Sequence, residues 1–388
     1  MPARTKVAWL AVVGMLLLGS LAKADDLDKG IEQFERGDYV AAHLSFTIAG
    51  EDGDVRAAPW LAADYYVGWG AKADERLAER WARIAKAQTA REDAEKAVLR
   101  WRKLADAGEP AGCIAMGRAY ESGVGVTASP VEAFRWYKLA ADQGSARGQY
   151  ALATMYGAGI GVETDFKECL RLLNLAAAQG DDWSQYQIGN AYLRGTGVRR
   201  SFRTAGEWIA RAAQAGNPLA AYNLAVMYDQ GDGFSRDYGE AFKWYQRAAA
   251  QGVPNAQNNL AVLYYRGQGV SKDVFTAYQF STIAHDQESL VGESDQQTFD
   301  FAHRTIQSEL SEAQKRAAMF RLAERCRDED GVPRDAVQAY RYMTLSIDNE
   351  SEASVKEERT RARESLAATM RAQQIARAQS LVAGSESP

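Results

Sequence analysis

Residues 218–252 read PLAAYNLAVMYDQGDGFSRDYGEAFKWYQRAAAQG, and the pattern of this stretch returns along the chain at a fixed step of 36 residues. In each unit a tyrosine at a fixed position is followed by a Gly-x-Gly pair and then by a closing glycine, and no residue is inserted or lost between units. A fixed period of this length is typical of a solenoid, in which each unit buries its apolar face only against its neighbours. The closing glycines are Gly108, Gly144, Gly180, Gly216 and Gly252, and the tyrosines are Tyr120, Tyr156, Tyr192, Tyr228 and Tyr264.

Each unit is predicted to contain two helices. Over 218–230, apolar side chains recur at helical spacing, and the glycines at 231 and 233 end this helix because glycine reaches positive φ without a steric penalty. Asp237 is expected to cap a second helix, and Glu240, three residues later, to complete a capping box. The second helix stops at Gly252. We therefore predict an all-α fold of stacked helix pairs.

One slot in the second helix always holds a bulky side chain, namely Trp136, Leu172, Trp208, Trp244 or Phe280. Because the slot requires bulk and not one particular ring, we interpret these side chains as core, with an aromatic ligand box as the alternative. Cys169 occupies a slot that is alanine in the other units, which favours a packed thiol. A disulfide between Cys113 and Cys169 is the alternative for these two cysteines.

The unit resembles the Sel1-like repeat, a relative of the tetratricopeptide repeat. The resemblance lies in Ala-x-Tyr-Asn-Leu-Ala-x-Met-Tyr-x-x-Gly-x-Gly at 220–233 and Ala-Phe-Lys-Trp-Tyr-x-x-Ala-Ala-x-Gln-Gly at 241–252, and it covers five consecutive units. It implies a right-handed α/α superhelical solenoid that acts as a non-enzymatic adaptor or scaffold. Members of this family often occur in bacterial envelope, signalling or host-contact proteins.

The chain is predicted to divide into five parts. A signal peptide at 1–24 precedes degenerate helical repeats at 25–107, the five regular repeats at 108–288, a segment at 289–350 with a loop, a helix and one diverged repeat, and closing helices with a disordered tail at 351–388. The loop is placed at 291–297, and the diverged repeat at 318–350. Closing helices are expected at 310–322 and 370–381, because a polar-faced terminal helix shields the open end of a repeat core.

The N-terminal 24 residues have the pattern of a secretory signal peptide. Basic Arg4 and Lys6 precede an apolar run at 7–18 and a small-residue end at Ala22-Lys23-Ala24. The run is shorter than the roughly 20 apolar residues that span a bilayer, so we expect cleavage after Ala24 and no stable membrane insertion of the mature chain. The predicted location is periplasmic or secreted.

The composition and motifs argue against catalysis and against nucleic acid. The formal net charge is −5, which disfavours nucleic acid and anionic membrane as partners. No HExxH, no GxSxG and no phosphate loop occurs, and the Gly-x-Gly pairs are interpreted as turns between helices. The histidines His43, His285 and His303 lie in different segments. We predict no catalytic residue, no metal site and no cofactor.

Binding of a protein partner is the predicted function. Stacked helix pairs leave a curved groove lined by one helix of each pair. If the first helix lines it, an exposed tryptophan, amides and arginines face a peptide segment or domain of the partner. The groove candidates are Trp183, Gln187, Asn190, Arg194, Asn223, Gln230, Asn259 and Arg266. The alternatives are a polysaccharide- or peptidoglycan-binding module, with Trp183 as stacking platform, and a secreted host-interaction protein; ordinary surface residues are the plain interpretation of each single position.

Overall fold

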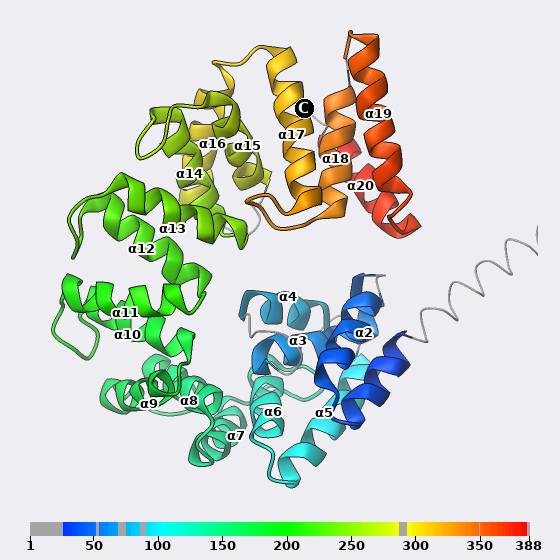
Figure 1. The fold of residues 1–388 in the computed structure, drawn as a ribbon. Helices are drawn as coiled ribbons and strands as arrows, with labels where there is room; N and C mark the ends of the chain where they lie inside the picture. Colours follow the sequence, from blue (N-terminus) through cyan, green and yellow to red (C-terminus); the bar gives the residue numbers. More distant parts are fainter. Residues whose placement is uncertain are drawn as a thin grey trace, which may run out of the picture. The chain divides into compact units, whose positions relative to one another are not determined.

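The computed structural model describes residues 26–51, 54–68, 75–85, 91–286, 293–348 and 350–385. Within these ranges every regular element is a helix (Figure 1), so the predicted all-α fold is confirmed. The predicted signal peptide at 1–24 lies outside the described residues.

The chain forms two compact units, which divide between Gln179 and Gly180. In the first unit, a helix at 26–35 is followed by α2 (Tyr39–Glu51), η1 (Val55–Ala57), α3 (Ala58–Val67), α4 (Glu75–Ala85), α5 (Arg91–Asp106), α6 (Pro110–Ser122), α7 (Pro130–Asp142), α8 (Ala146–Ala158) and α9 (Phe166–Ala178).

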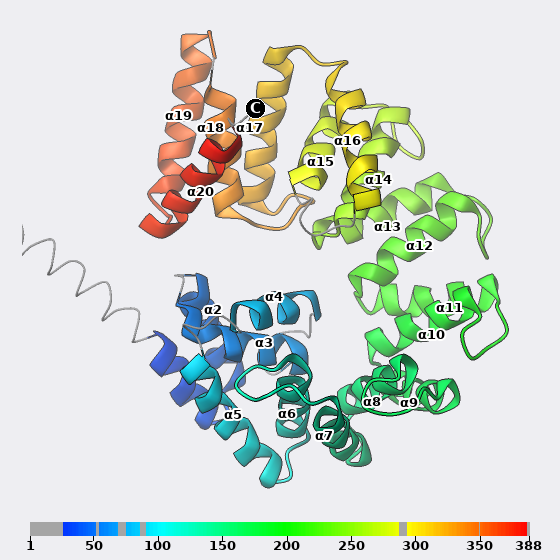
Figure 2. The same ribbon diagram turned by 180° about the vertical axis from the view of Figure 1, so that it is seen from behind.

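The second unit contains the remaining helices. Its repeats comprise α10 (Asp182–Arg194), α11 (Phe202–Gln214), α12 (Pro218–Gln230), α13 (Tyr238–Ala250), α14 (Pro254–Arg266) and α15 (Val274–Asp286). They are followed by α16 (Glu293–Gln307), α17 (Glu312–Asp328), α18 (Ala336–Ile347), α19 (Ala353–Ala367) and α20 (Ala372–Ser385), of which α19 and α20 both pack against α18 (Figure 2).

Consecutive helices pack against one another as pairs, and small residues make the close approach possible. In α13, Ala241, Ala248 and Ala249 are fully buried together with Tyr245. Ala220 and Ala225 of α12 belong to the same apolar core. Since a methyl group is the whole side chain at these contacts, two helix backbones can lie close while the aromatic rings fill the space beside them.

The two glycines of each Gly-x-Gly pair have different roles. Gly231 ends α12 in the left-handed region with φ 83°, and its N–H donates to the carbonyl oxygen of Met227. Gly233 lies against the preceding repeat, where an added Cβ would stand 2.5 Å from the carbonyl oxygen of Phe202. In the next repeat, Gly269 lies in the same way against Tyr238. The second glycine is therefore required because one repeat packs directly on the backbone of the one before it.

The expected capping box at Asp237 and Glu240 is only half formed. The Asp237 carboxylate accepts from the backbone N–H groups of Gly239 and Glu240, as predicted. The reciprocal bond, from the backbone N–H of Asp237 to the Glu240 side chain, does not form between these two residues. This N–H donates instead to the carbonyl oxygen of Tyr228 at 2.9 Å, and the Glu240 carboxylate pairs with Lys243 at 2.7 Å. A complete capping box occurs at Ser311 and Gln314, where α17 begins.

The helices that follow the regular repeats differ from the predicted organisation in three places. The expected loop at 291–297 is wrong over 293–297, where α16 has begun. The expected closing helix at 310–322 coincides from residue 312 with the first part of α17, which pairs with α18 as the first helix of a repeat. The expected tail is helical at 383–385, where α20 ends. Residues 386–388 lie outside the described part of the chain.

The three cysteines are free thiols in the structure. Cys113 is buried, and the amide of Gln143 lies 3.9 Å from its sulfur. Cys169 is only partly buried, unlike the fully buried alanines of its slot. Burial, and after it the nearby Asp165, raises the pKa of the Cys169 thiol to about 11. A thiol that is protonated at neutral pH is a poor nucleophile and a poor metal ligand.

Candidate functional site

The amide residues of the predicted groove lie on the first helices of successive repeats in the second unit. We call this surface the amide face and define it by Gln187 and Asn190 of α10, Asn223 of α12 and Asn259 of α14. All four side chains are partly buried. The amide nitrogen of Asn223 lies 3.4 Å from the carbonyl oxygen of Asn190 and 3.4 Å from the hydroxyl of Tyr186. The structure thus brings together two predicted residues that are 33 positions apart.

Asn259, the third asparagine of the amide face, bonds a tyrosine from α13. The amide nitrogen of Asn259 donates to the Tyr245 hydroxyl at 3.0 Å, and this hydroxyl donates to Asp229 at 3.3 Å. Burial, and then the charge of Asp229, raises the pKa of Tyr245 far above its usual value, so the phenol keeps its proton. The bonds connect α12, α13 and α14, and they fix the amide plane of Asn259.

The ends of the same helices carry the remaining predicted polar residues. Arg194, Gln230 and Arg266 are each the last residue of their helix, and all three are exposed. Arginines at these positions also complement the negative end of the helix dipole. Their exposure leaves the guanidinium groups of Arg194 and Arg266 accessible to a partner.

The expected exposure of Trp183 is wrong. Its side chain is 5% exposed, and its ring makes an edge contact with Tyr186, one turn further along α10, with the centroids 6.4 Å apart. Residues three apart share one helix face, so this contact covers part of the ring. Trp183 therefore contributes to the core of the repeat and offers no open aromatic platform.

Sequence reasoning missed a histidine cluster between α15 and α16. The rings of His285 and His303 lie 5.0 Å apart, and Nε2 of His285 is 3.3 Å from a carboxylate oxygen of Asp300. Nδ1 of His303 lies 3.1 Å from the hydroxyl of Ser281, and its ring stacks on Tyr278. Burial, and then the charge of His285, lowers the pKa of His303 to about 4.

This cluster is not arranged for nucleophilic catalysis. The hydroxyl of Ser281 donates to the carbonyl oxygen of Tyr278 at 3.0 Å, and the side chain is 1% exposed. A substrate could not reach a hydroxyl that is covered and already bonded along its own helix. Asp286 likewise accepts from Tyr342 at 2.6 Å and pairs with Arg341 at 2.7 Å, which joins α15 to α18. These groups hold helices together.

The third histidine takes part in a buried pair in the first unit. Nδ1 of His43 lies 3.2 Å from the carboxylate of Asp64, which is almost completely buried. Burial raises the pKa of Asp64 to about 6, and the hydrogen bond from His43 partly opposes this shift. The pair connects α2 to α3.

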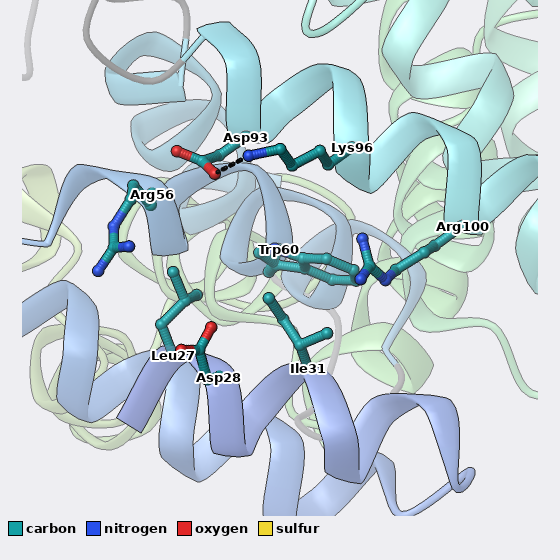
Figure 3. A pocket seen from close by; sticks show the side chains of 8 residues that line it. All are labelled: Leu27, Asp28, Ile31, Arg56, Trp60, Asp93, Lys96 and Arg100. Atoms are coloured by element: carbon teal, nitrogen blue, oxygen red, sulfur yellow. Dashed lines mark hydrogen bonds and ion pairs between the residues drawn. The ribbon is translucent and has the colours of Figure 1, made fainter. Parts of the chain in front are cut away.

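A pocket of about 200 Å³ opens in the first unit between the helix at 26–35, α3 and α5 (Figure 3). Trp60 forms its floor beside Leu27 and Ile31, and the guanidinium of Arg100 lies over the Trp60 ring. Each cation on its rim already has a carboxylate partner: Arg56 with Asp54, Lys96 with Asp93, and Arg100 with Glu35. None of these three cations is therefore unpaired and available to a ligand.

Two further properties concern the described residues only. Among them, no group of three or more histidine, cysteine, aspartate or glutamate side chains is placed to hold a metal ion. None of their helices combines the length and the apolar character that a membrane span requires.

Comparison with protein families finds a match to the Sel1 repeat over more than half of the chain. The matched residues are 57–89, 110–145, 146–181, 184–217, 218–253, 254–287 and 316–351. The first and last matches lie in the flanks for which the sequence predicts degenerate or diverged repeats. In the last one, the N–H of Asp335 donates to the carbonyl oxygen of Cys326 at 2.8 Å, so Cys326 stands where other repeats have their tyrosine.

Solved structures with similarity include three bacterial proteins. A Sel1 repeat protein from Oxalobacter formigenes is 22% identical, with 70% of this chain and 98% of that chain covered and a TM-score of 0.46. A protective antigen of uropathogenic Escherichia coli with an SLR fold is 24% identical (93% and 91% covered, TM-score 0.30). An immunity protein from Pseudomonas aeruginosa is 18% identical (61% and 81% covered, TM-score 0.33). A comparison with curated proteins gave no match.

Proposed function

Because this chain belongs to the Sel1 repeat family, whose repeats commonly build protein-interaction scaffolds, we propose that it is a non-enzymatic scaffold that binds an extended segment of a protein partner across the amide face. The observation that carries the proposal is the hydrogen-bonded placement of Asn190 and Asn223 on neighbouring first helices.

Primary amides suit the backbone of a peptide. Each has two N–H donors and a carbonyl acceptor, and a peptide unit offers one donor and one acceptor in return. Asn259 is oriented by Tyr245, and Asn223 by Tyr186 and Asn190, so these side chains lose little conformational freedom when a partner binds. A site that is ordered before binding retains more of its interaction energy as affinity.

The spacing of the amides also fits an extended chain. The side chains of Asn190 on α10 and Asn223 on α12 are close enough to bond each other. An extended segment that crosses the first helices would therefore meet one amide group per repeat. Recognition through the backbone leaves the partner's side chains to determine specificity.

The test compares the double variant Asn190→Ala/Asn223→Ala with the control Gln214→Ala/Gln246→Ala, which removes two exposed amides from the second helices α11 and α13. Each protein is used for affinity capture from an envelope extract, and thermal unfolding is measured in parallel. We expect the amide-face variant to lose partners that the control retains, with both proteins folded. Equal capture by the two variants would reject the amide face as the binding surface.

We further propose that the scaffold acts in the bacterial envelope, after export and cleavage behind Ala24. A partner in signalling, exopolysaccharide production or envelope assembly fits this location, and a secreted host-interaction protein is the alternative. Cell fractionation with determination of the mature N-terminus tests it, since a retained residue 1 or a cytoplasmic pool alone would contradict export. A polysaccharide- or peptidoglycan-binding module is not favoured, because Trp183, its stacking platform, is buried.

A further inference from the structure

Four arginines gather where α10 joins α11, and all four side chains are exposed. We call them the arginine edge: Arg194, Arg199, Arg200 and Arg203. We propose that the arginine edge binds carboxylate side chains of the partner, so that the segment on the amide face is flanked by acidic residues. This inference rests on the proposed function, because Arg194 belongs to α10, which also carries Gln187 and Asn190.

The backbone brings the arginines together at one end of the helix pair. Arg194 is the last residue of α10, and Gly195 caps the helix in the left-handed region with φ 76°. The Cβ of Arg200 lies 3.4 Å from the point where Gly195 would carry its own Cβ, so the loop folds back beside the helix end. The guanidinium of Arg200 lies over the ring of Phe202, 4.4 Å from its centroid.

The charges of the arginine edge are poorly compensated. Arg203 lies 3.6 Å from Glu207, but the two side chains are 88% and 56% exposed, so this pair contributes little. Among the residues that the structure describes, no carboxylate lies within ion-pair distance of Arg194, Arg199 or Arg200. This local excess of positive charge stands on a chain whose net charge is −5.

Arg194 complements the C-terminal end of α10, but local helix stability does not explain Arg203. The first turn of a helix favours negative charge, and Glu132, Glu168 and Glu240 supply it in α7, α9 and α13. The first turn of α11 has no acidic residue and carries Arg203, three positions after Arg200. Arg203 therefore opposes the helix dipole, and a position that breaks a local rule is a candidate for function.

A short acidic peptide fits this surface better than a nucleic acid. The loop that carries Asp232 and Asp237 packs on the start of α11 through Gly233, which lies against Phe202. A long polyanion that followed the arginine edge would meet these carboxylates, whereas one or two carboxylates of a peptide would not. Arginine also binds carboxylates in a bidentate manner, which gives such a contact geometric specificity.

The test selects binders from a displayed library of random twelve-residue peptides on the full chain. The variants are Arg194→Glu/Arg199→Glu/Arg200→Glu and, as a milder form, the same positions changed to Gln. The control Arg36→Glu/Arg135→Glu/Arg361→Glu makes the same change in net charge at three exposed arginines elsewhere. Asn190→Ala/Asn223→Ala tests the amide face separately. Selected peptides are then synthesised and titrated at low and high salt, beside a single-stranded DNA oligonucleotide.

We expect the selected peptides to be enriched in aspartate and glutamate. They should bind the arginine-edge variants at least about tenfold more weakly than the unchanged chain, and the control with unchanged affinity. Enriched peptides without acidic residues, or equal binding by the arginine-edge variants, would overturn this inference while the proposed function stands. Tighter binding of the DNA than of any peptide would overturn it in favour of nucleic acid. Failure to select any peptide, or peptides that the amide-face variant binds unchanged, would overturn the proposed function and this inference with it.

Discussion

The backbone N–H of Asp237 donates to the carbonyl oxygen of Tyr228 at 2.9 Å, and this bond joins the start of the second helix of a repeat to the end of the first. The same bond recurs between Asp165 and Tyr156 and between Asp273 and Tyr264. The loop between the two helices is therefore closed at both ends, by the glycine cap of the first helix and by this bond.

The first prediction concerns the cap that Asp237 forms. Asp237→Ala removes the carboxylate that accepts from two N–H groups at the start of α13, so we expect the free energy of unfolding to fall by about 1 kcal/mol. Glu240→Gln is the control, because Glu240 forms only an exposed pair with Lys243 and should change stability by less than about 0.5 kcal/mol. Urea unfolding followed by circular dichroism measures both. A larger effect of the Glu240 change would indicate that the capping box is complete after all.

The second prediction separates the two glycines of a Gly-x-Gly pair. Gly231→Ala places a side chain at an unfavourable positive φ but makes no close contact, since the nearest atom to the new Cβ would belong to Arg236 at 3.5 Å. It should lower the free energy of unfolding by about 1–2 kcal/mol. Gly233→Ala has a similar φ of 78° but also drives a methyl group to 2.5 Å from the carbonyl oxygen of Phe202. We therefore expect the Gly233 variant to be clearly the less stable of the two in thermal unfolding. Equal losses would mean that the contact between repeats is not close.

The third prediction concerns pH. His303 has a folded-state pKa of about 4, below its usual value of 6.5, so the unfolded chain binds the proton more readily. The stability that the neutral ring contributes is present above pH 6.5 and is lost as the pH falls towards 4. His303→Phe keeps a ring beside Tyr278 but cannot titrate. The unfolding midpoint of the second unit should decline less steeply with acid in this variant, and parallel declines would show that His303 is not responsible.

The fourth prediction addresses the orientation of the amide face. Tyr245→Phe deletes the hydroxyl that connects Asp229 with Asn259, so we expect a loss of about 1–2 kcal/mol in stability together with weaker binding of peptides selected on the full chain. Tyr265→Phe removes an exposed bond to Glu309 and serves as control. If Tyr245→Phe lowered stability but left peptide affinity unchanged, Asn259 would not belong to the binding surface.

The sequence predicted the repeat well because its packing is local. The first helix was expected at 218–230, which are the bounds of α12, since the periodic apolar residues and the glycine cap act within a few turns. Spacing alone could not predict that Trp183 is buried and contacts Tyr186, because a position on a helix face does not fix the direction of a large ring. The contact between His285 and His303 was also missed. It depends on α16, a helix outside the 36-residue step, whose packing the period does not define.

The most direct test of the central claim is site-specific photocrosslinking in the full chain, with a photoreactive amino acid at Gln187 on the amide face and, as control, at the exposed Gln246 on α13. A scaffold that binds a peptide segment across α10, α12 and α14 should give a covalent adduct with a polypeptide from Gln187 and none from Gln246. An adduct from Gln246 alone, or adducts of equal yield from both positions, would contradict the amide face as the binding surface.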